Sequence, residues 1–595
     1  MILSMLILGV FSYTHAQTYS DYIGAGNDSG ITVTTSSSEA NSDGNNTING
    51  KGLDAAKYEA SRFLAQATLG HTMTQIESLA TGLDFDAWID DQIAQTPTNF
   101  LDETFIIYDE VVALQEAAGV PEEDIDNPHG VHFNYAWWQS LIDKDDQLRQ
   151  RVAFALSELL VISMESGLKS WPEAIASFYD IFTENAFGNY SDILTEVAMH
   201  PSMGFYLSHY NNPMAVPEEN IHPDENFARE IMQLFSIGLF ELNQDGSEKL
   251  DINGKPIPTY DQDDIKDLAK VFTGLSAGGL EDWVEWTDEP YFGIGIYACD
   301  KTIPMVMYDE YHETEEKTIL GENFSAGQTG MEDINQAIDL LFNHPNIAPF
   351  VSFRLIQRLV KSNPSPEYIT RVSNAFDDNG SGVRGDMVAV IKAILLDEEA
   401  RTCASMLAND AGKLKEPIIR YTQVARGLEK DSPAGRYWNH GFNYSLEVQQ
   451  IAMNSPTVFN FYLPDHEPAG LLSDNGLVGP EFQIHTTATA TGYINYVHKW
   501  MLWDKLMWSW EQDYGDIPVT VNDFDYDLMA GEDAETFINY LDILFTHGRM
   551  SDETRNTIRN AITPLAEMPD VDSVQTRSRL AIYLTLISSE FAILR

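Results

Sequence analysis

Helical periodicity is the feature that most limits what this chain can fold into. From Asp54 onward apolar residues recur every three to four positions, and Leu148, Val152 and Leu156, for example, fall on one helical face. Gly and Pro separate the periodic segments, whereas the alternation typical of strands is sparse. The pattern predicts an all-α or mainly α protein: a large multi-helix globular domain with long irregular loops and at most minor β-hairpins.

The expected helices are spread over most of the chain. They lie at residues 54–66, 145–160, 171–186, 191–199, 223–238, 331–341, 348–361, 366–376, 387–396, 417–428, 536–545 and 577–594. The stretch Tyr291 to Met307 is a candidate for a small hairpin. No repeat of fixed period is present.

The first 52 residues differ from the rest. An apolar run of about ten residues followed by Thr14-His-Ala16 predicts a signal peptide over residues 1–16, cleaved before Gln17. Residues 17–52 are rich in Ser, Thr, Asn and Gly and are expected to form a flexible leader, with the helical domain over residues 53–595. No later apolar stretch reaches about 18 residues, so membrane insertion is not expected. The protein is therefore expected to be exported, as a periplasmic, cell-surface or secreted protein.

The charge balance narrows the range of partners. The chain carries 91 Asp and Glu against 35 Lys and Arg, a formal net charge of −56. Such a field repels nucleic acid and anionic membranes; it either keeps the surface soluble at high salt or attracts cationic substrates. Cys299 and Cys403 are too few for a disulfide scaffold or a cysteine metal site, and are either one bridge or two buried thiols.

One predicted helix, Pro223 to Gly238, has the most informative polar face. At about 100° per residue Glu225, Asn226, Arg229 and Glu230 share one arc, with apolar residues opposite. Glu225 with Arg229 and Asn226 with Glu230 are spaced to pair within the helix. The arc is either an ordinary solvated face or the wall of a pocket. In a pocket, Arg229 would bind an anionic group or hold one carboxylate ionised while the other acts as acid or base.

Several blocks resemble a known family in the same order along the chain. The helix contains Glu225-Asn-Phe-Ala-Arg-Glu230, the hallmark of the bacterial domain-of-unknown-function 1800 family, and the resemblance extends from about Asp54 to the C-terminus. Further similar blocks are Arg62 to Gly70, Leu148 to Ser157, His200 to Leu207, Tyr260 to Gly274, His312 with Lys317 and Gly321, Asn379 to Asp386, Leu414 to Pro417, Ser455 to Phe461 and Pro480 to Ile484. The resemblance implies an exported, largely helical protein without an established reaction. It also implies an exported sulfatase-like protein as a partner.

Metal binding is a second hypothesis, with the cofactor otherwise unknown. His200, His222 and His312, beside Asp309 and Glu313, would bind a divalent cation if the fold brought them together. Against this, the histidines are scattered, and a lone His in a loop is more often a capping or core hydrogen-bonding group. The segment 377–386 half-matches a calcium loop but lacks the final acid, so a tight turn with Asp386 capping the next helix is the simpler interpretation.

Aromatic residues beside acids give the best indication of a ligand. Trp283, Trp286 and Tyr291 lie in a long irregular stretch rich in Asp and Glu, a composition suited to stacking against a polysaccharide. Two functions follow. The first is an extracellular or periplasmic hydrolase or lyase acting on a glycan, with Glu225, Arg229, Glu230 and His312 as the catalytic residues and Asn226 and the three aromatics as ligand-binding residues. The second is a non-catalytic binding or assembly protein, in which the helix carries a structural ion-pair network.

Overall fold

The structure, a computed structural model, is mainly helical, as the periodicity predicts. It describes residues 55–402, 410–429, 435–502, 534–567 and 573–595, with Ser405 and Ala408. The predicted signal peptide, the leader and Cys403 lie outside these residues; Cys299 is buried. In the described part of the chain no helix is long and apolar enough to cross a membrane.

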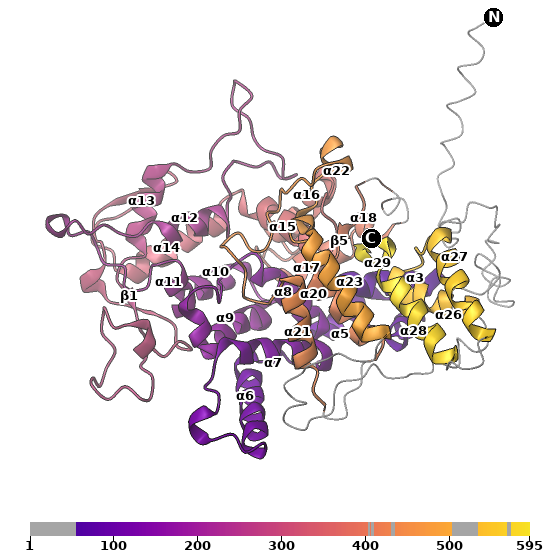
Figure 1. The fold of residues 1–595 in the computed structure, drawn as a ribbon. Helices are drawn as coiled ribbons and strands as arrows, with labels where there is room; N and C mark the ends of the chain where they lie inside the picture. The colour runs from indigo at the N-terminus through magenta and orange to yellow at the C-terminus, as the bar shows by residue number, and fades with distance from the viewer. Residues whose placement is uncertain are drawn as a thin grey trace, which may run out of the picture.

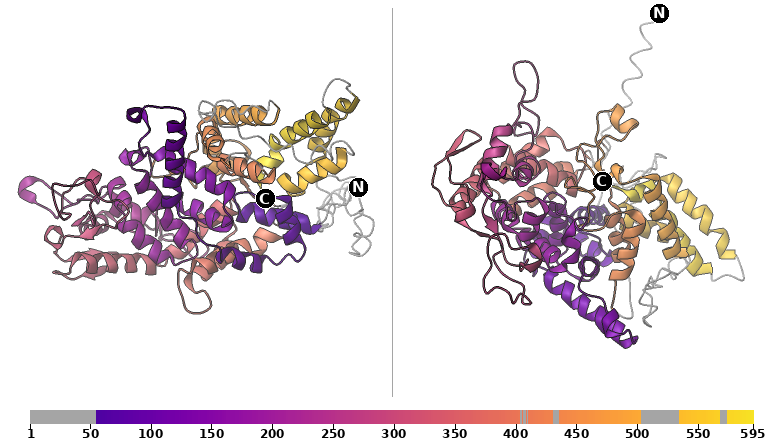
Figure 2. Two further views of the ribbon diagram at one scale, coloured as in Figure 1. Left: turned by 90° about the horizontal axis from the view of Figure 1, so that it is seen from below. Right: turned by 60° about the vertical axis from the view of Figure 1, so that its left-hand side comes forward.

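The helices form an elongated body with two distinct ends (Figure 1). Both views of Figure 2 keep α12, α13 and α14 at the end opposite to α26, α27 and α28. The helices are α3 (Ala55–Ala67), α4 (Met73–Ala80), α5 (Phe85–Ile93), α6 (Phe100–Ala117), α7 (Gly130–Asp143), α8 (Gln147–Ser157), α9 (Pro172–Asn185), α10 (Tyr190–Met199), α11 (Pro201–Tyr206), α12 (Asn226–Gln233), α13 (Gln262–Val271), α14 (Gly330–Asn343), α15 (Ile347–Leu359), α16 (Pro366–Asp377), α17 (Met387–Leu395), α18 (Glu398–Arg401), α20 (Pro417–Gly427), α21 (Trp438–Val448), α22 (Leu471–Asp474), α23 (Thr487–Leu502), α26 (Ala534–Leu541), α27 (Asp552–Ile562), α28 (Ser573–Leu586) and α29 (Ser589–Ala592).

The strands are short and antiparallel. β1 (Leu275–Ser276) pairs with β2 (Val306–Met307), β3 (Lys317–Ile319) with β4 (Glu322–Phe324), and β5 (Lys413–Leu414) with β6 (Ile593–Leu594). The predicted hairpin within Tyr291 to Met307 is wrong, because Val306 and Met307 pair with β1 and not with a strand of the same stretch. The long excursion between β1 and β2 carries the aromatic residues singled out from the sequence.

A buried charged hub joins elements from distant parts of the chain. We define it as Glu158, Arg358, Lys413, Glu416 and Glu481, each at most 9% exposed. Arg358 Nη1 lies 3.5 Å from Glu158 Oε2, and Lys413 Nζ lies 2.9 Å from Glu481 Oε1 and 3.7 Å from Glu416 Oε1. Glu416 and Glu481 belong to blocks quoted above, and Glu158 directly follows a third. Those blocks therefore meet in one scaffold.

Candidate functional site

Helix α12 is shorter than the sequence predicts, and tertiary contacts set its start. Helical geometry begins at Asn226 rather than Pro223, because Asn212 Oδ1 accepts the backbone N–H of Asp224 and Asp224 in turn accepts that of Asn226. At the other end, Gly238 has a φ of +72° and donates its N–H to the Met232 carbonyl at 2.9 Å. This left-handed glycine ends the helical segment as expected.

The first half of the polar arc is a solvated ion pair. Arg229 Nη2 lies 3.2 Å from Glu225 Oε2, and both side chains are more than a third exposed. Gln262, at the start of α13, donates to the same oxygen at 2.7 Å. The predicted pairing of Glu225 with Arg229 is therefore confirmed. The predicted pairing of Asn226 with Glu230 is wrong: within the described residues no hydrogen bond joins them, and Asn226 is exposed at the first turn.

Glu230 differs sharply from Glu225. It is only 7% exposed, and its Oε2 is buried without a hydrogen-bond partner in the described part of the chain. Burial raises the pKa of Glu230, and the neighbouring Arg229 offsets only part of this effect. A buried carboxyl without any hydrogen-bond partner is costly, which makes Glu230 a candidate for a functional role.

Two tyrosines lie near enough to Glu230 for its charge to affect their pKa values, and the sequence analysis singled out neither. The pKa of Tyr206, at the end of α11, is raised by burial and then by Glu230. Burial raises the pKa of Tyr260 to about 12, with Arg229 lowering it and Glu230 raising it. The Tyr260 hydroxyl is itself buried without a partner among the described residues. Tyr260 lies two residues before Gln262, so the segment leading into α13 runs beside the side of α12 that carries Glu225 and Glu230. Only the matching block gave a sequence hint of this.

His312 does not join this group. Its ring lies against Thr273, 3.0 Å from the carbonyl oxygen, and 3.0 Å from Asp333 Oδ2. Lys317 contacts the same carboxylate oxygen at 2.5 Å, and all three side chains are fully buried. Burial alone would raise the pKa of Asp333, but the hydrogen bonds from His312 and Lys317 lower it below its usual value. The proposed catalytic role of His312 is therefore replaced by a structural one.

The irregular segment between β1 and β2 displays a group of exposed rings. We call Trp283, Trp286 and Tyr297 the aromatic platform; each is 53–55% exposed. The ring centroids of Trp283 and Trp286 are 5.3 Å apart, and Trp283 lies roughly parallel to Tyr297 at 6.4 Å. Tyr291 is also exposed, but among the described residues its ring makes no such contact. Tyr297 is the member that the sequence reasoning missed, although it lies in the same aromatic-rich stretch.

Two consecutive asparagines tie this segment to the start of α12. Asn211 accepts the backbone N–H of Gly293 through Oδ1 and donates through Nδ2 to the Ile294 carbonyl. Asn212 accepts the N–H of Asp224, as described above. Asn211 has a φ of +61°, an uncommon left-handed value. The chain turns there, so the Asn211 side chain bonds the platform segment and the Asn212 side chain bonds the start of α12. The platform segment and α12 are therefore anchored to one short stretch of backbone.

The other sequence hypotheses resolve into structural roles. His200 accepts the Ser202 N–H at the start of α11, and His222 is exposed. No group of three or more His, Cys, Asp or Glu side chains in the described ranges is arranged to hold a metal ion, so the three histidines do not form the site considered above. Asp386 accepts the N–H groups of Val388 and Ala389 and caps α17, which confirms the tight-turn interpretation.

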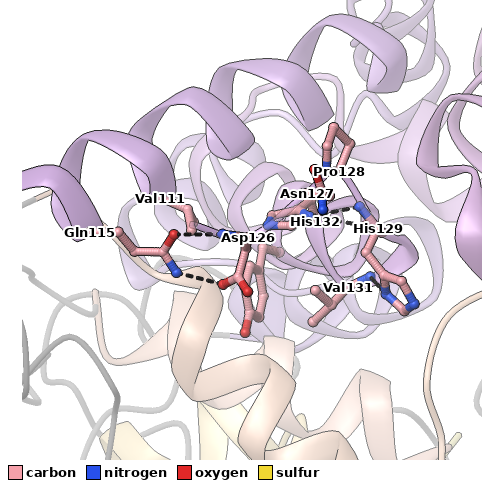
Figure 3. Close-up of a pocket in the computed structure, with 9 residues that line it drawn as sticks. Val111, Gln115, Asp126, Asn127, Pro128, His129, Val131 and His132 are labelled. Carbon is pink, nitrogen blue, oxygen red and sulfur yellow. Dashed lines mark hydrogen bonds between the residues drawn. The ribbon is translucent and has the colours of Figure 1, made fainter. Parts of the chain in front are cut away.

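Two cavities elsewhere have largely satisfied polar linings. One of about 560 Å³ lies between α6 and α7, where Gln115 and Asp126 bond each other twice (Figure 3). Another, of about 610 Å³, contains Ser177 3.2 Å from His200 Nε2. This pair is not a nucleophile with its base. Burial lowers the pKa of His200 to about 3, and Nδ1 accepts an N–H, so the ring proton lies on Nε2 and is donated to the serine.

The fold and the site describe a large helical protein with a carboxylate-bearing helix beside an exposed aromatic segment. The chain belongs to the family described as protein of unknown function (DUF1800), whose profile matches residues 62–593. No curated protein and no solved structure matches the chain.

Proposed function

We propose that this is an exported hydrolase that cleaves a glycan, with Glu230 as proton donor and Glu225 as the second carboxylate. The observation that carries the proposal is the contrast between the two carboxyls. Glu225 is paired with Arg229 and Gln262 at the surface, whereas Glu230 is buried and unpaired with a raised pKa. Pairs of carboxyls in such different environments divide the roles of acid and base in glycosidic cleavage.

In this proposal the platform binds the sugar chain and α12 acts on it. The Glu230 carboxyl gives its proton to the leaving glycosidic oxygen as the C–O bond breaks. Glu225 takes a proton from water, whose oxygen forms the new bond to the anomeric carbon. The burial of Glu230, with Tyr206 and Tyr260 nearby, keeps its carboxyl protonated over a wider pH range.

The test is a pair of carboxamide variants. The full chain is incubated with neutral, amino-bearing and sulfated polysaccharides, and new reducing ends are measured. Glu230→Gln is expected to lower the rate by about 10² to 10⁴-fold with an unchanged or slightly higher melting temperature. Wild-type activity should fall as pH rises through the pKa of Glu230, and Glu122→Gln, in an exposed short 3-10 helix, should behave as wild type. Wild-type activity in Glu230→Gln, or no cleavage of any polymer, would contradict the proposal.

Non-catalytic binding is the second candidate, and the closed cluster of His312, Asp333 and Lys317 favours it. That cluster removes the histidine from the catalytic set, while the platform can bind sugar without any chemistry. In this case the chain would present a glycan to a partner such as an exported sulfatase-like protein. Binding that depends on Trp283, together with no cleavage by the wild type, would distinguish this function from hydrolysis.

A further inference from the structure

We infer that the aromatic platform selects a cationic glycan, one whose sugars carry free amino groups, over neutral and sulfated polymers. The inference rests on the proposed use of the platform as a glycan subsite and names the substrate class. It is carried by the charges that surround the three rings.

Up to Asp300, all the charged residues of the platform segment are acidic. Between Val271 and Asp300 there is no Lys or Arg, while six acids occur, namely Glu281, Asp282, Glu285, Asp288, Glu289 and Asp300. Asp282, Glu285, Asp288 and Glu289 are exposed, and none of the four forms an ion pair within the described residues. The next basic residue along the chain is Lys301. It is buried and paired with Glu173 and Glu281, so it presents no positive charge to a ligand.

Rings and carboxylates together suit an ammonium group. The faces of Trp283, Trp286 and Tyr297 present negative π-density as well as an apolar surface, so they stack on a sugar ring and attract a cation. The neighbouring carboxylates add attraction for each amine along the polymer. A sulfated or uronate-bearing polymer would be repelled by the same groups and by the net charge of −56.

The same charges bear on the reaction. Elimination by a lyase requires a uronate carboxylate, which a cationic side chain normally neutralises. Here Arg229 is paired with Glu225, and the platform segment contains no Lys or Arg that could neutralise a uronate. The surroundings therefore favour hydrolysis of an amino-sugar polymer over elimination in an acidic one.

The experiment compares three oligosaccharides of equal length: free-amine glucosamine, its N-acetylated form and a sulfated form. Binding to the full chain is measured at a pH below the pKa of the amines. At about 0.1 M salt, where the Debye length is roughly 10 Å, the free-amine form should bind about tenfold tighter than the acetylated form. At about 1 M salt the preference should fall to within roughly twofold.

Variants separate the rings from the charges. Trp283→Ala should weaken binding of both amine and acetylated forms. The double variant Asp282→Asn with Glu285→Gln should remove the amine preference and keep binding of the acetylated form. The control Glu122→Gln with Glu123→Gln makes the same charge change on another surface and should leave binding of all three sugars unchanged.

Equal or tighter binding of the acetylated or sulfated form, or a preference that survives the platform double variant, would overturn the inference. Cleavage of the acetylated polymer that depends on Glu230 would leave the proposed function standing in that case. Failure of all three sugars to bind would overturn the inference and the glycan-binding role alike.

Discussion

The buried hub and the α12 surface use the same residue types in opposite ways. In the hub, the carboxylates of Glu416 and Glu481 each face Lys413, and Gln450 donates to Glu416 at 2.7 Å. On α12, the Glu230 side chain is nearly as buried but has no hydrogen-bond partner in the described chain. Glu416 Oε1 and Glu481 Oε2 also lack a hydrogen bond among the described residues, but each of those carboxylates keeps a cation or an amide donor, whereas the Glu230 carboxyl has no such partner there. A buried carboxyl left without any partner is tolerated more readily at a functional site than in a scaffold.

The comparison also changes what the family blocks mean. Several of them, including Leu414 to Pro417 and Pro480 to Ile484, supply the hub and not an open site. Asn460, from a third block, donates to Glu158 at 3.1 Å. A block shared with a family therefore identifies a function only when its side chains are left available for a ligand.

The largest effect is expected in the hub. Lys413→Met would remove the ammonium that the buried Glu416 and Glu481 carboxylates both face, leaving Arg358 as the remaining cation of the hub, and should lower the free energy of unfolding by about 3–5 kcal/mol. Denaturant midpoints measure this, with Lys266→Met as the control, because its pair with Asp263 is exposed and should cost less than about 1 kcal/mol. A loss at Lys413 as small as that of the control would mean that the hub charges are solvated.

The His312 cluster should give the next largest effect, with a defined pH dependence. Asp333→Asn leaves Lys317 buried without its carboxylate and should cost about 3 kcal/mol near neutral pH. Since the pKa of Asp333 is lower in the folded state, its contribution is present above its unfolded pKa of about 3.9 and is lost as pH falls through the folded value.

Unfolding curves of wild type and Asp333→Asn should therefore differ at neutral pH and converge only below about pH 4. A constant difference across that range would show that Asp333 does not titrate with the cluster. The wild-type rate of glycan cleavage per folded molecule should be retained in this variant, because His312 lies outside the proposed site.

Local features of this molecule could be predicted from the sequence, and distant pairings could not. The predicted helical segments depend on periodicity within a dozen residues, and Glu225 with Arg229 is a pair four residues apart, so both were accessible. Other helices, among them α6, α7, α13, α21, α23 and α27, were not among the predicted segments. His312 was misassigned because its partners Thr273 and Asp333 lie 39 and 21 residues away. The start of α12 was placed three residues early because Asn212, from the preceding loop, sets it.

The candidate site shows the same division. The Trp283 and Trp286 pair was visible as a short motif, yet Tyr297 joins them only through the folding of the segment between β1 and β2. The distinction between Glu225 and Glu230 was out of reach as well. Both lie on one helical arc in sequence, and only the folded structure shows that one is more than a third exposed and the other buried.

The smallest expected effect is on the free energy of unfolding, which Glu225→Gln should lower and Glu230→Gln should raise. Glu225→Gln breaks an exposed pair and should lower the free energy of unfolding by about 0.3–0.5 kcal/mol. Glu230→Gln should instead raise it, by about 1 kcal/mol or less, because a neutral amide replaces a buried carboxyl that resists ionisation.

The pKa of Glu230 is raised in the folded state, so its stabilising contribution is complete below its unfolded pKa of about 4.3 and is lost as pH rises through the folded value. The gain from Glu230→Gln should therefore be present at about pH 8 and absent at about pH 4, measured by denaturant unfolding beside Glu225→Gln. A loss of stability in both variants at about pH 8 would place Glu230 with the paired carboxylates of the hub and remove the contrast on which its catalytic role depends.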